Sequence, residues 1–425
     1  MKKVLIITYY WPPSGGSGVQ RWLKFSKYFP EFGFQPIIYT PENPDFSTQD
    51  NSLMSDISDE TVVLKKKIIE PYSLQRLLFK GSDNTVFGVT NNKENWKSKL
   101  SLWLRSNVFI PDPKLLWIKP SAKYLEKYIK ENNIEHVITT GPPHSMHLIG
   151  LRLKKKLGTQ INWLADFRDP WVEIDFFHHL PMSELVRNRH KELENKVLKN
   201  ADRVIVIGEH MKNQFSDRTS KIEVITNGYD DFKSVTEMPL TELFTITHLG
   251  IINRDRNSEL LWSVLKELCE ESEEFKRSLK VQFIGQISPD TTTYFNTHLG
   301  SNFVHIPKVP HSEVWKYQVS TQVLLLLVNN VPNSEGIITG KIFEYLNAKR
   351  PILAIGPKQG DLANIINQTN SGRIVDFSDR EGMKCYILDC FERYKSNQLT
   401  ADSLGLNKYH RKSLTKDLAQ VLSNL

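Results

Sequence analysis

The chain has 425 residues, a length that favours two domains, each able to bury its own hydrophobic core. Its three cysteines, Cys269, Cys385 and Cys390, form no CxxC pair and no cluster with histidines, which argues against a disulfide framework or a structural zinc site and indicates a reducing compartment. The net charge of +7 at pH 7 indicates an anionic partner, for which we expect a membrane surface or metabolites rather than nucleic acid.

A short apolar run at residues 3–9 predicts the first strand, and its apolar core is too short for a signal peptide or a membrane span. We therefore expect a cytoplasmic protein. The next stretch, YYWPPSGGSGVQRW (9–22), is a glycine-rich turn that leads into a helix predicted at 19–29. Gly15, Gly16 and Gly18 would let the backbone approach a ligand near the helix N-terminus, a geometry that suits phosphate. The alternative is a plain tight turn.

Basic residues gather between residues 61 and 130, where fourteen lysines and arginines stand against five acids, a net charge of +9. Within this segment, WKSKLSLWLR (96–105) places tryptophan and leucine on one face of a predicted helix and basic side chains largely on the other. We predict an interfacial helix that binds an anionic membrane surface, at the inner face of the membrane. The alternative is a solvated amphipathic helix packed on its own domain.

Short apolar runs rich in β-branched residues alternate with helical patterns, which predicts parallel sheets covered by helices on both faces. In the first half, the predicted strands are residues 3–9, 36–40, 136–141, 161–167 and 203–208. The second half repeats the pattern at residues 244–250, 280–286, 304–307, 323–329, 351–356 and 372–377. The predicted fold class is therefore α/β, with two doubly wound, Rossmann-like domains in series.

A polar segment without strong periodicity, residues 227–243, separates the two predicted sheets and suits a hinge. We place the first domain at residues 1–230 and the second at residues 231–407. The remaining residues, 408–425, are predicted to form a helix that crosses back to brace the first domain.

The segment EGIITGKIFEYLNAKRPILAIG (335–356) carries the strongest chemical signal in the chain. A glycine-containing loop follows a predicted strand and Lys341 opens the next helix, so loop amides, a helix N-terminus and an ammonium group converge on an anion. Glu344 follows three residues later on the same helix face, where it can accept hydrogen bonds from sugar or ribose hydroxyls. The pattern predicts a site for a nucleotide joined to a hydroxylated group. The alternative is an ordinary helical ion pair.

Across nearly its whole length the chain resembles GT-B glycosyltransferases of the family 4 type. The resemblance rests on the order of these motifs: YYWPPSGGSGVQR, ADFRDPW (165–171), ADRVIVIG, VITNGYD (224–230), HLGIINRDRN (248–257), FIGQ and GKIFEYLNAKRPIL. It implies two Rossmann-like domains that face a central cleft. In such enzymes the second domain binds most of a nucleotide sugar donor and the first binds the acceptor.

The resemblance also implies donor-binding residues. Arg256, with Arg254 as a companion, and Lys341 would neutralise the donor diphosphate, and Glu344 would hold the ribose hydroxyls. The other implied donor-binding residues are Gly15, Gly16, Gly18, Glu335, Thr339 and Gly340. Two departures from the family pattern stand out. Eight residues separate Glu335 from Glu344 where the family usually has seven, and arginine stands at a position where the family has lysine. A guanidinium group can still clamp phosphate oxygens bidentately.

The motif LADFRDPW places charged residues at the carboxyl end of a predicted buried strand in the first domain. Acids at this edge are candidates for acceptor contact, and we predict that Asp169 orients or deprotonates the acceptor hydroxyl, with Asp166 and Arg168 as its supporting ion pair. The alternative is a structural network that ties the loop down, because buried charges need partners in any case. His144, in TGPPHSMH, is a further residue that could hydrogen-bond to acceptor or donor.

The reaction implied by the resemblance is transfer of a sugar from a nucleoside diphosphate sugar to a hydroxyl group of a glycan or lipid-linked saccharide, with retention of anomeric configuration. The chain has no DxD motif in a metal-ligating context, so we predict that arginine, lysine and helix N-termini replace a metal and that no cofactor is needed.

Three other functions remain open from the sequence. A dinucleotide-dependent oxidoreductase needs a tighter glycine fingerprint than either half shows. A sugar-nucleotide epimerase of the same two-domain shape would convert its sugar without an acceptor. A non-catalytic nucleotide-sugar-binding protein would bind the donor and turn nothing over.

Overall fold

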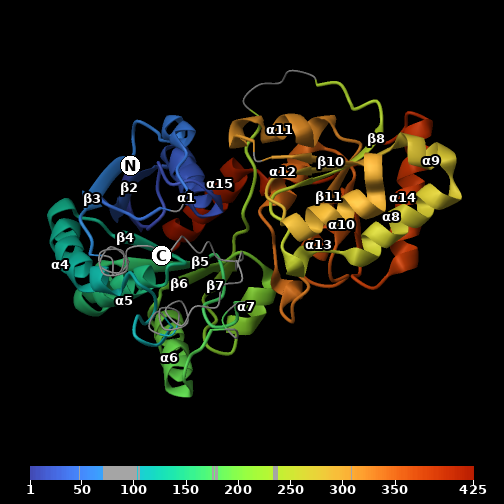
Figure 1. Cartoon of the computed structure of the whole chain (residues 1–425). Helices are drawn as coiled ribbons and strands as arrows, with labels where there is room; N and C mark the ends of the chain where they lie inside the picture. The colour runs from blue at the N-terminus through green and yellow to red at the C-terminus, as the bar shows by residue number, and fades with distance from the viewer. Residues whose placement is uncertain are drawn as a thin grey trace. The chain divides into compact units, whose positions relative to one another are not determined.

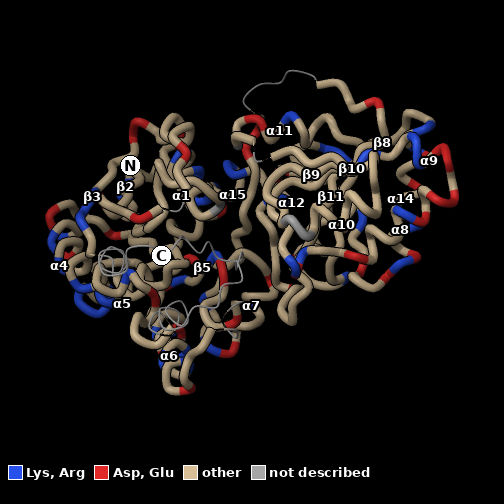
Figure 2. Tube along the Cα trace, viewed as in Figure 1, with Lys and Arg blue, Asp and Glu red and all other residues tan. Residues whose placement is uncertain are grey.

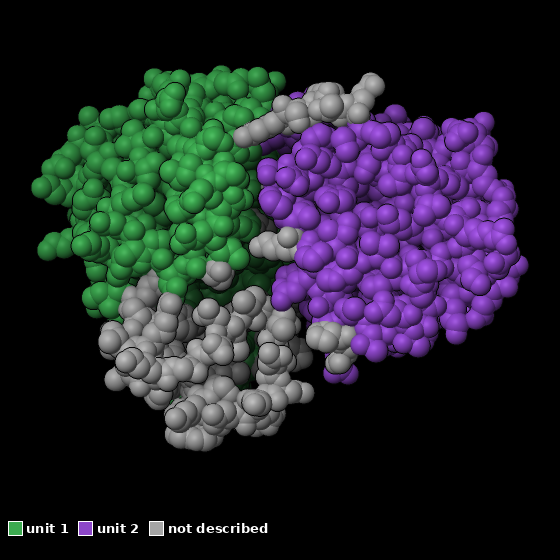
Figure 3. Space-filling view, turned by 45° about the horizontal axis from the view of Figure 1, so that its top comes forward, with its two compact units in different colours: residues 1–227, 411–425 green, residues 228–410 purple. Residues whose placement is uncertain are grey.

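The computed structural model describes residues 1–46, 48–69, 103, 106–174, 177, 180–232, 238–307 and 309–425. These residues form two compact units. Unit 1 comprises residues 1–227 and 411–425, and unit 2 comprises residues 228–410 (Figure 3). Most of the interfacial helix predicted at 96–105, and residues 233–237 of the predicted hinge, lie outside the described residues.

Unit 1 contains a parallel sheet of seven strands in the order β3-β2-β1-β4-β5-β6-β7 (Figure 1). Its strands are β1 (Lys2–Ile7), β2 (Phe34–Pro41), β3 (Val62–Lys66), β4 (His136–Gly141), β5 (Asn162–Phe167), β6 (Arg203–Val206) and β7 (Ile222–Val224). The inner strands are apolar and almost fully buried, as expected for a parallel sheet with helices on both faces. The sequence pattern did not predict the edge strands β3 and β7, because β3 is largely half-exposed and β7 has only three residues.

The helices of unit 1 pack on this sheet. They include α1 (Ser17–Tyr28), α4 (Leu115–Asn132), α5 (Ser145–Leu157), α6 (Glu184–Asn200), α7 (Glu209–Phe215) and α15 (Arg411–Ser423), with 3₁₀ turns η1 (Phe29–Phe32), η2 (Asn51–Asp56) and η3 (Gly158–Gln160). Helix α15, at the far end of the chain, belongs to this unit because Leu414, Leu418 and Leu422 share an apolar cluster with Trp22 and Phe25 of α1. Residues from both ends of the chain therefore build the core of unit 1.

Unit 2 contains a parallel sheet of six strands in the order β10-β9-β8-β11-β12-β13 (Figure 1). Its strands are β8 (Phe244–Leu249), β9 (Leu279–Ile284), β10 (Phe303–Ile306), β11 (Val323–Leu327), β12 (Ile352–Ile355) and β13 (Gly372–Val375). All six match predicted strands. Its helices include α8 (Glu259–Glu271), α9 (Glu273–Ser278), α10 (Pro289–Leu299), α11 (His311–Ser320), α12 (Lys341–Ala348), α13 (Asp361–Thr369) and α14 (Arg380–Lys395), with 3₁₀ turns η5 (Arg254–Arg256), η6 (Gly300–Asn302), η7 (Ser334–Gly336) and η8 (Leu406–Tyr409).

The two sheets confirm the predicted α/β class with two doubly wound, Rossmann-like halves. In each sheet the chain order reverses at the first strand: β1 lies between β2 and β4, and β8 lies between β9 and β11. In open parallel sheets, ligands bind outside the carboxyl ends of the strands at such a reversal. A ligand site is therefore expected at each of these two edges.

A buried ion pair connects three elements of unit 1. Asp166, the fifth residue of β5, is fully buried, and its carboxylate accepts hydrogen bonds from Arg21 Nη2 (2.8 Å), Trp22 Nε1 (2.8 Å) and Thr140 Oγ1 (2.8 Å). Arg21 also donates to two backbone carbonyls that follow β7, each at 2.8 Å. Both charges are thus removed from water with hydrogen-bond partners in place, the condition under which burying them is tolerated.

We predict that Asp166→Asn destabilises unit 1, because it leaves the Arg21 guanidinium buried without its opposite charge. Breaking a buried pair by removing one charge costs about 3–5 kcal/mol of unfolding free energy. Urea unfolding followed by tryptophan fluorescence measures this loss. Glu131→Gln, which breaks an exposed pair with Lys127 on α4, serves as the control and should cost less than about 1 kcal/mol. Equal stability of the two variants would contradict the structural role of Asp166.

Candidate functional site

The glycine-rich turn between β1 and α1 lies at the carboxyl edge of the unit 1 sheet. Gly16 precedes α1 with φ +88, a conformation that favours glycine, and it is exposed. The amide of Gly15 donates to the carbonyl of Thr48 (3.0 Å), so a neighbouring loop holds the turn in place. At Gly18, a Cβ atom would lie 3.0 Å from Tyr10 Cδ2. The fold of the turn itself therefore accounts for glycine at Gly16 and Gly18, and Gly16 is accessible to a ligand.

Arg168, directly after β5, connects the carboxyl ends of the central strands of unit 1. Its guanidinium donates to the carbonyls of Gly18 (2.7 Å), Gly141 (3.4 Å) and Pro142. Burial lowers the pKa of Arg168, and attraction to Asp169 opposes that change. Arg168 thus links the end of β4 to the start of α1, which follows β1. It lies next to the Asp169 carboxylate.

The ion pair predicted between Asp166 and Arg168 is wrong. Asp166 lies inside β5, where Arg21 of α1 reaches its carboxylate, whereas Arg168 lies beyond the strand end, where backbone carbonyls accept its hydrogen bonds. Asp169 follows Arg168 in the loop and is partly exposed. Of the two acids predicted at this edge, Asp169 is therefore the one that solvent reaches.

His144 is nine-tenths buried at the start of α5 and stacks on Trp171, with ring centroids 4.5 Å apart. Burial, followed by repulsion from His147, lowers its pKa well below the usual value, so its imidazole is neutral. Its Nδ1 atom has no hydrogen-bond partner among the described residues. The ring of His144 is therefore held mainly by packing against Trp171. Its Nδ1 atom is left to accept or donate a hydrogen bond.

Lys341 and Gly250 approach each other closely at the carboxyl end of β8 in unit 2. Lys341 is the first residue of α12, and a Cβ atom on Gly250 would lie 2.6 Å from both Cε and Nζ of that lysine. Gly250 has φ +119, and Gly285, after β9, has φ +132 with its Cβ position 2.3 Å from the Gly250 carbonyl oxygen. The missing side chain of Gly250 thus provides the space in which the Lys341 side chain lies, and Gly285 leaves room for the Gly250 backbone.

Arg256, the last residue of η5, is a second cation at this edge. Its Nε donates to Asn329 Oδ1 (2.7 Å), just after β11, and its Nη1 donates to the Ile251 carbonyl (3.5 Å). Its backbone amide donates to Asn253 Oδ1 (3.1 Å), which caps the 3₁₀ turn. The side chain of Arg254, the predicted companion, is exposed. The turn and Asn329 together fix the direction of the Arg256 guanidinium.

The two cations influence each other. The pKa of Lys341 falls to about 7, first because burial disfavours the charged ammonium and second because Arg256 repels it. Attraction to Glu344 opposes this change. An anion bound beside Lys341 and Arg256 would replace repulsion by attraction and stabilise the protonated lysine. The geometry and the charges therefore indicate an anion site.

The other predicted donor-binding residues surround the start of α12. Glu344, one turn after Lys341, accepts a hydrogen bond from Gln318 Nε2 of α11 (2.8 Å). Thr339 Oγ1 accepts a hydrogen bond from the Lys341 amide (3.4 Å), and Gly340 is exposed with open space around its Cβ position. These residues therefore lie near Lys341 along the chain, with Glu344 held towards α11.

Glu335 lies apart from α12, in the 3₁₀ turn η7. Its side chain is exposed, and its backbone packs against Gly360, whose Cβ position lies 2.3 Å from the Glu335 carbonyl oxygen. Gly360 precedes α13 and has φ +107. The turn that contains Glu335 is therefore anchored on α13 by its backbone, and the carboxylate is accessible to solvent.

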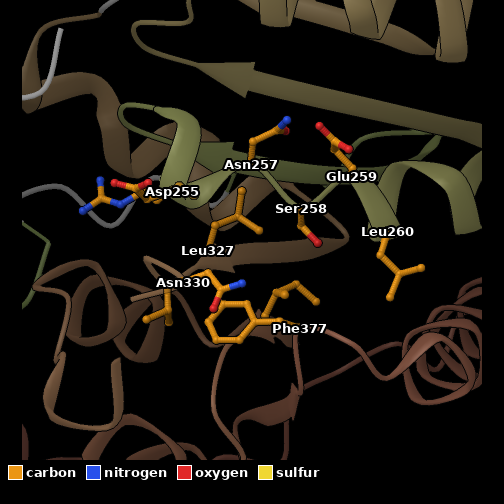
Figure 4. Close-up of a pocket in the computed structure, with 11 residues that line it drawn as sticks. Asp255, Asn257, Ser258, Glu259, Leu260, Leu327, Asn330 and Phe377 are labelled. Carbon is orange, nitrogen blue, oxygen red and sulfur yellow. The ribbon is translucent and has the colours of Figure 1, made fainter. Parts of the chain in front are cut away.

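A cavity of about 210 Å³ lies at the carboxyl ends of β11 and β12 (Figure 4). Arg256 forms part of its wall. Its other walls include Asp255, Glu259 at the start of α8, Asn330 and Phe377. Two carboxylates make this cavity unfavourable for a diphosphate. The anion site indicated by Lys341 and Gly250 is therefore the better place for phosphate, and the cavity suits uncharged polar groups.

Several residues of these edges were missed by sequence reasoning. Arg21 ends the YYWPPSGGSGVQR motif without an assigned role and Asn329 belongs to no quoted motif, and only the fold shows that they hold Asp166 and Arg256. Gly250 belongs to the HLGIINRDRN motif, but the sequence alone assigned it no role. A glycine directly after an apolar strand is a signal that could have identified it.

No group of three or more histidine, cysteine, aspartate or glutamate side chains in the described part of the chain could hold a metal ion. In the same residues, no helix combines the length and the apolar character needed to cross a membrane.

The family model of Glycosyltransferase Family 4 matches residues 17–231, which is more than half of the chain. Among curated proteins, no sequence matches the chain significantly. The match covers most of unit 1, including part of the glycine-rich turn and the whole ADFRDPW motif.

Solved structures similar to the whole chain include three proteins of low sequence identity. Sucrose-phosphate synthase from Thermosynechococcus elongatus has a TM-score of 0.62 at 12% identity, covering 100% of this chain and 99% of that one. A glycosyltransferase from Rickettsia africae has a TM-score of 0.63 at 15% identity, with the same coverage. Anabaena HepE in complex with UDP-glucose has a TM-score of 0.62 at 11% identity, with 100% of both chains covered. These likenesses show a GT-B fold.

We predict that the pKa of Lys341 lies near 7 and rises in an Arg256→Met variant, because the neighbouring positive charge is removed. NMR titration of lysine ε-carbons measures both values. Arg277→Met, which removes an arginine 80% exposed on α9, is the control and should leave the titration of Lys341 unchanged. A Lys341 pKa near its ordinary value in the wild-type protein would contradict the described environment.

Proposed function

The chain belongs to Glycosyltransferase Family 4, and from this premise we propose that it transfers a sugar from a nucleoside diphosphate sugar to a hydroxyl acceptor, with unit 2 binding the nucleotide. The observation that carries the proposal is the position of Lys341 over Gly250, beside Arg256. A diphosphate supplies the negative charge that this arrangement lacks. The structurally similar Anabaena protein was solved in complex with UDP-glucose, a donor of this chemical class.

In the proposed reaction the bond between the sugar C1 atom and the β-phosphate oxygen breaks, and its electron pair stays on the nucleoside diphosphate. Lys341 and Arg256 stabilise the charge that develops on this leaving group, in the role that a metal has in other transferases. The acceptor oxygen forms the new bond to C1 and gives up its proton. We propose retention of configuration, as the family resemblance implies, and independence of metals and cofactors, because arginine and lysine supply the positive charge and the sequence has no DxD motif in a metal-ligating context.

Asp169 is the proposed residue for contact with the acceptor hydroxyl. It is partly exposed at the carboxyl edge of the unit 1 sheet, next to Arg168, whereas Asp166 is engaged inside the sheet. A carboxylate in this place can orient the hydroxyl or accept its proton. His144, at the start of α5 on the same edge, is proposed as a further contact to the acceptor, and Gly16, before α1, as a contact to the donor.

A glycan or lipid-linked saccharide at an anionic membrane surface is the proposed acceptor. Unit 1 supports this by its charge: lysines of α4 and of the last turn of α5 occur on two helices that pack together (Figure 2). Trp103 is 49% exposed. Basic side chains with an exposed tryptophan favour the interface of anionic lipid. In this setting the protein would work at the cytoplasmic face of a membrane.

We predict that the protein binds nucleoside diphosphates and that Lys341→Met weakens this binding by about 10-fold or more, since a hydrogen bond to a charged group contributes roughly 1.5–3 kcal/mol. Calorimetry with UDP, GDP, ADP and dTDP tests both statements. Lys349→Met, at the end of α12, is the matched control and should keep the wild-type affinity. Equal affinity of the wild-type and Lys341→Met proteins for every nucleotide would contradict the proposal.

The same experiment has a pH signature. Lys341 is largely neutral at pH 8.5 in the free protein, because its pKa is about 7. A bound diphosphate raises that pKa, so binding at pH 8.5 should take up about one proton, visible as a dependence of the binding enthalpy on the buffer. Affinity should accordingly fall as the pH rises above 7. Lys341→Arg should bind without proton uptake, because guanidinium stays charged.

We expect Asp169→Asn to lower turnover by about 100-fold or more while nucleotide affinity stays within about twofold, since general acid–base groups contribute roughly 10²–10⁴. A radiolabelled sugar transferred from its nucleotide to a membrane extract provides the assay. Asp217→Asn, at an exposed position after α7, is the control. Unchanged turnover of Asp169→Asn would remove this residue from the mechanism.

Membrane binding is tested by co-sedimentation with vesicles. We expect binding to vesicles that contain phosphatidylglycerol, weakened by high salt because the interaction is electrostatic. Replacement of the exposed α4 lysines Lys123 and Lys127 by glutamate should also reduce binding to these vesicles. Equal binding to neutral vesicles at high salt would show that basic charge is not what recruits the protein.

A further inference from the structure

The two central strands of unit 2 separate at their carboxyl ends. Strands β8 and β11 are paired at two positions only, Ile246 with Val323 and Thr247 with Leu324. The corresponding strands of unit 1, β1 and β4, are paired at four positions. Beyond Thr247, β8 continues to pair with β9, and β11 continues to pair with β12. The separation is therefore confined to the point where the strand order reverses.

The hydroxyl group of Tyr345 bridges this separation. It accepts a hydrogen bond from the Leu249 amide of β8 (3.3 Å) and donates one to the Leu325 carbonyl of β11 (3.3 Å). Burial raises the pKa of Tyr345, so the phenol keeps the proton that it donates. The His248 Nδ1 atom shares the Leu325 carbonyl at 3.0 Å. One phenol thus hydrogen-bonds to the ends of two strands, to the Leu249 amide of β8 and to a Leu325 carbonyl that His248 also binds.

Tyr345 and Lys341 lie on one face of α12, because they are four residues apart on the same helix. The tyrosine ring is fully buried, so it fixes that face of α12 against the sheet. Gly250, over which Lys341 lies, directly follows Leu249, the residue whose amide Tyr345 binds. A single hydroxyl group therefore connects the strand end below the anion site to the helix that carries the cation.

We propose that Tyr345 is a positioning residue for the donor diphosphate: its hydroxyl keeps β8 and β11 apart and holds α12 so that Lys341 stays over Gly250. Without the hydroxyl, the Leu249 amide loses a partner, and α12 is free to shift relative to the strand end. Such a shift of α12 moves the Lys341 ammonium away from its place beside Arg256. The proposal rests on the proposed function where nucleotide affinity is measured, because a nucleotide must bind. The titration of Lys341 tests it without any bound nucleotide.

Tyr345→Phe tests the proposal, because it removes only the hydroxyl and keeps the ring that fills the core. The matched control is Tyr39→Phe in unit 1, which removes the hydroxyl of another fully buried tyrosine, bonded there to Ser121 Oγ (2.9 Å). For each variant, urea unfolding gives stability, calorimetry gives the affinity for UDP, GDP, ADP and dTDP, and NMR of lysine ε-carbons gives the titration of Lys341.

We expect both variants to lose similar stability, whereas only Tyr345→Phe should bind nucleotide about fivefold or more weakly, in line with a lost hydrogen bond of roughly 1 kcal/mol. The Lys341 titration should move to higher pH in Tyr345→Phe alone, as the ammonium leaves Arg256. In turnover assays, kcat/KM for the donor should fall in Tyr345→Phe and not in Tyr39→Phe, because a displaced Lys341 no longer stabilises the charge that develops on the leaving group. Wild-type affinity together with a wild-type Lys341 titration in a folded Tyr345→Phe protein would overturn the proposal.

The two proposals can fail separately. If the wild-type protein binds none of the nucleotides, the proposed function fails, and the Lys341 titration still decides the role of Tyr345. If the wild-type protein binds nucleotide and Tyr345→Phe binds it equally well, the proposed function stands and the positioning role is refuted.

Discussion

The structure of unit 2 depends on one electrostatic constraint: two cationic side chains are held near each other at the carboxyl edge of a parallel sheet. Lys341 is buried enough for its pKa to fall to about 7, and Arg256 adds repulsion to the cost of burial. Such an arrangement is unfavourable for the free protein and favourable once an anion is bound. The binding of an anionic ligand therefore explains why the two cations lie near each other better than a contribution to folding stability does.

The scaffold around these cations is built from features that have no charge. Gly250 leaves the space that the lysine occupies, Gly285 leaves room for the Gly250 backbone, and Asn329 directs the arginine. The hydroxyl of Tyr345 fills the separation between β8 and β11. Unit 1 uses its equivalent edge differently: there Arg168 binds three carbonyls, and the acid that stays accessible is Asp169. The two edges are thus suited to different partners.

The sequence predicted the architecture well, because buried parallel strands are continuous apolar runs with a strong signal, as at residues 323–327. It failed at the edge strands of unit 1, β3 and β7, and at Asp166, whose partner Arg21 lies 145 residues away in the chain. Local spacing predicted Arg168 as that partner, but in the structure Arg21, from a distant segment, binds the Asp166 carboxylate. Lys341 was predicted from its place at a helix start, while Gly250 was given no role although it directly follows an apolar strand, and only the structure shows how close the lysine lies to it.

A crystal structure of the protein with a bound nucleoside diphosphate would decide whether the two cations bind the donor. We expect phosphate oxygens within hydrogen-bond distance of Lys341 Nζ and of the Arg256 guanidinium, above the carboxyl end of β8. A nucleotide whose phosphates occupy the cavity between Asp255 and Phe377 instead, with the lysine ammonium making no contact to them, would contradict it.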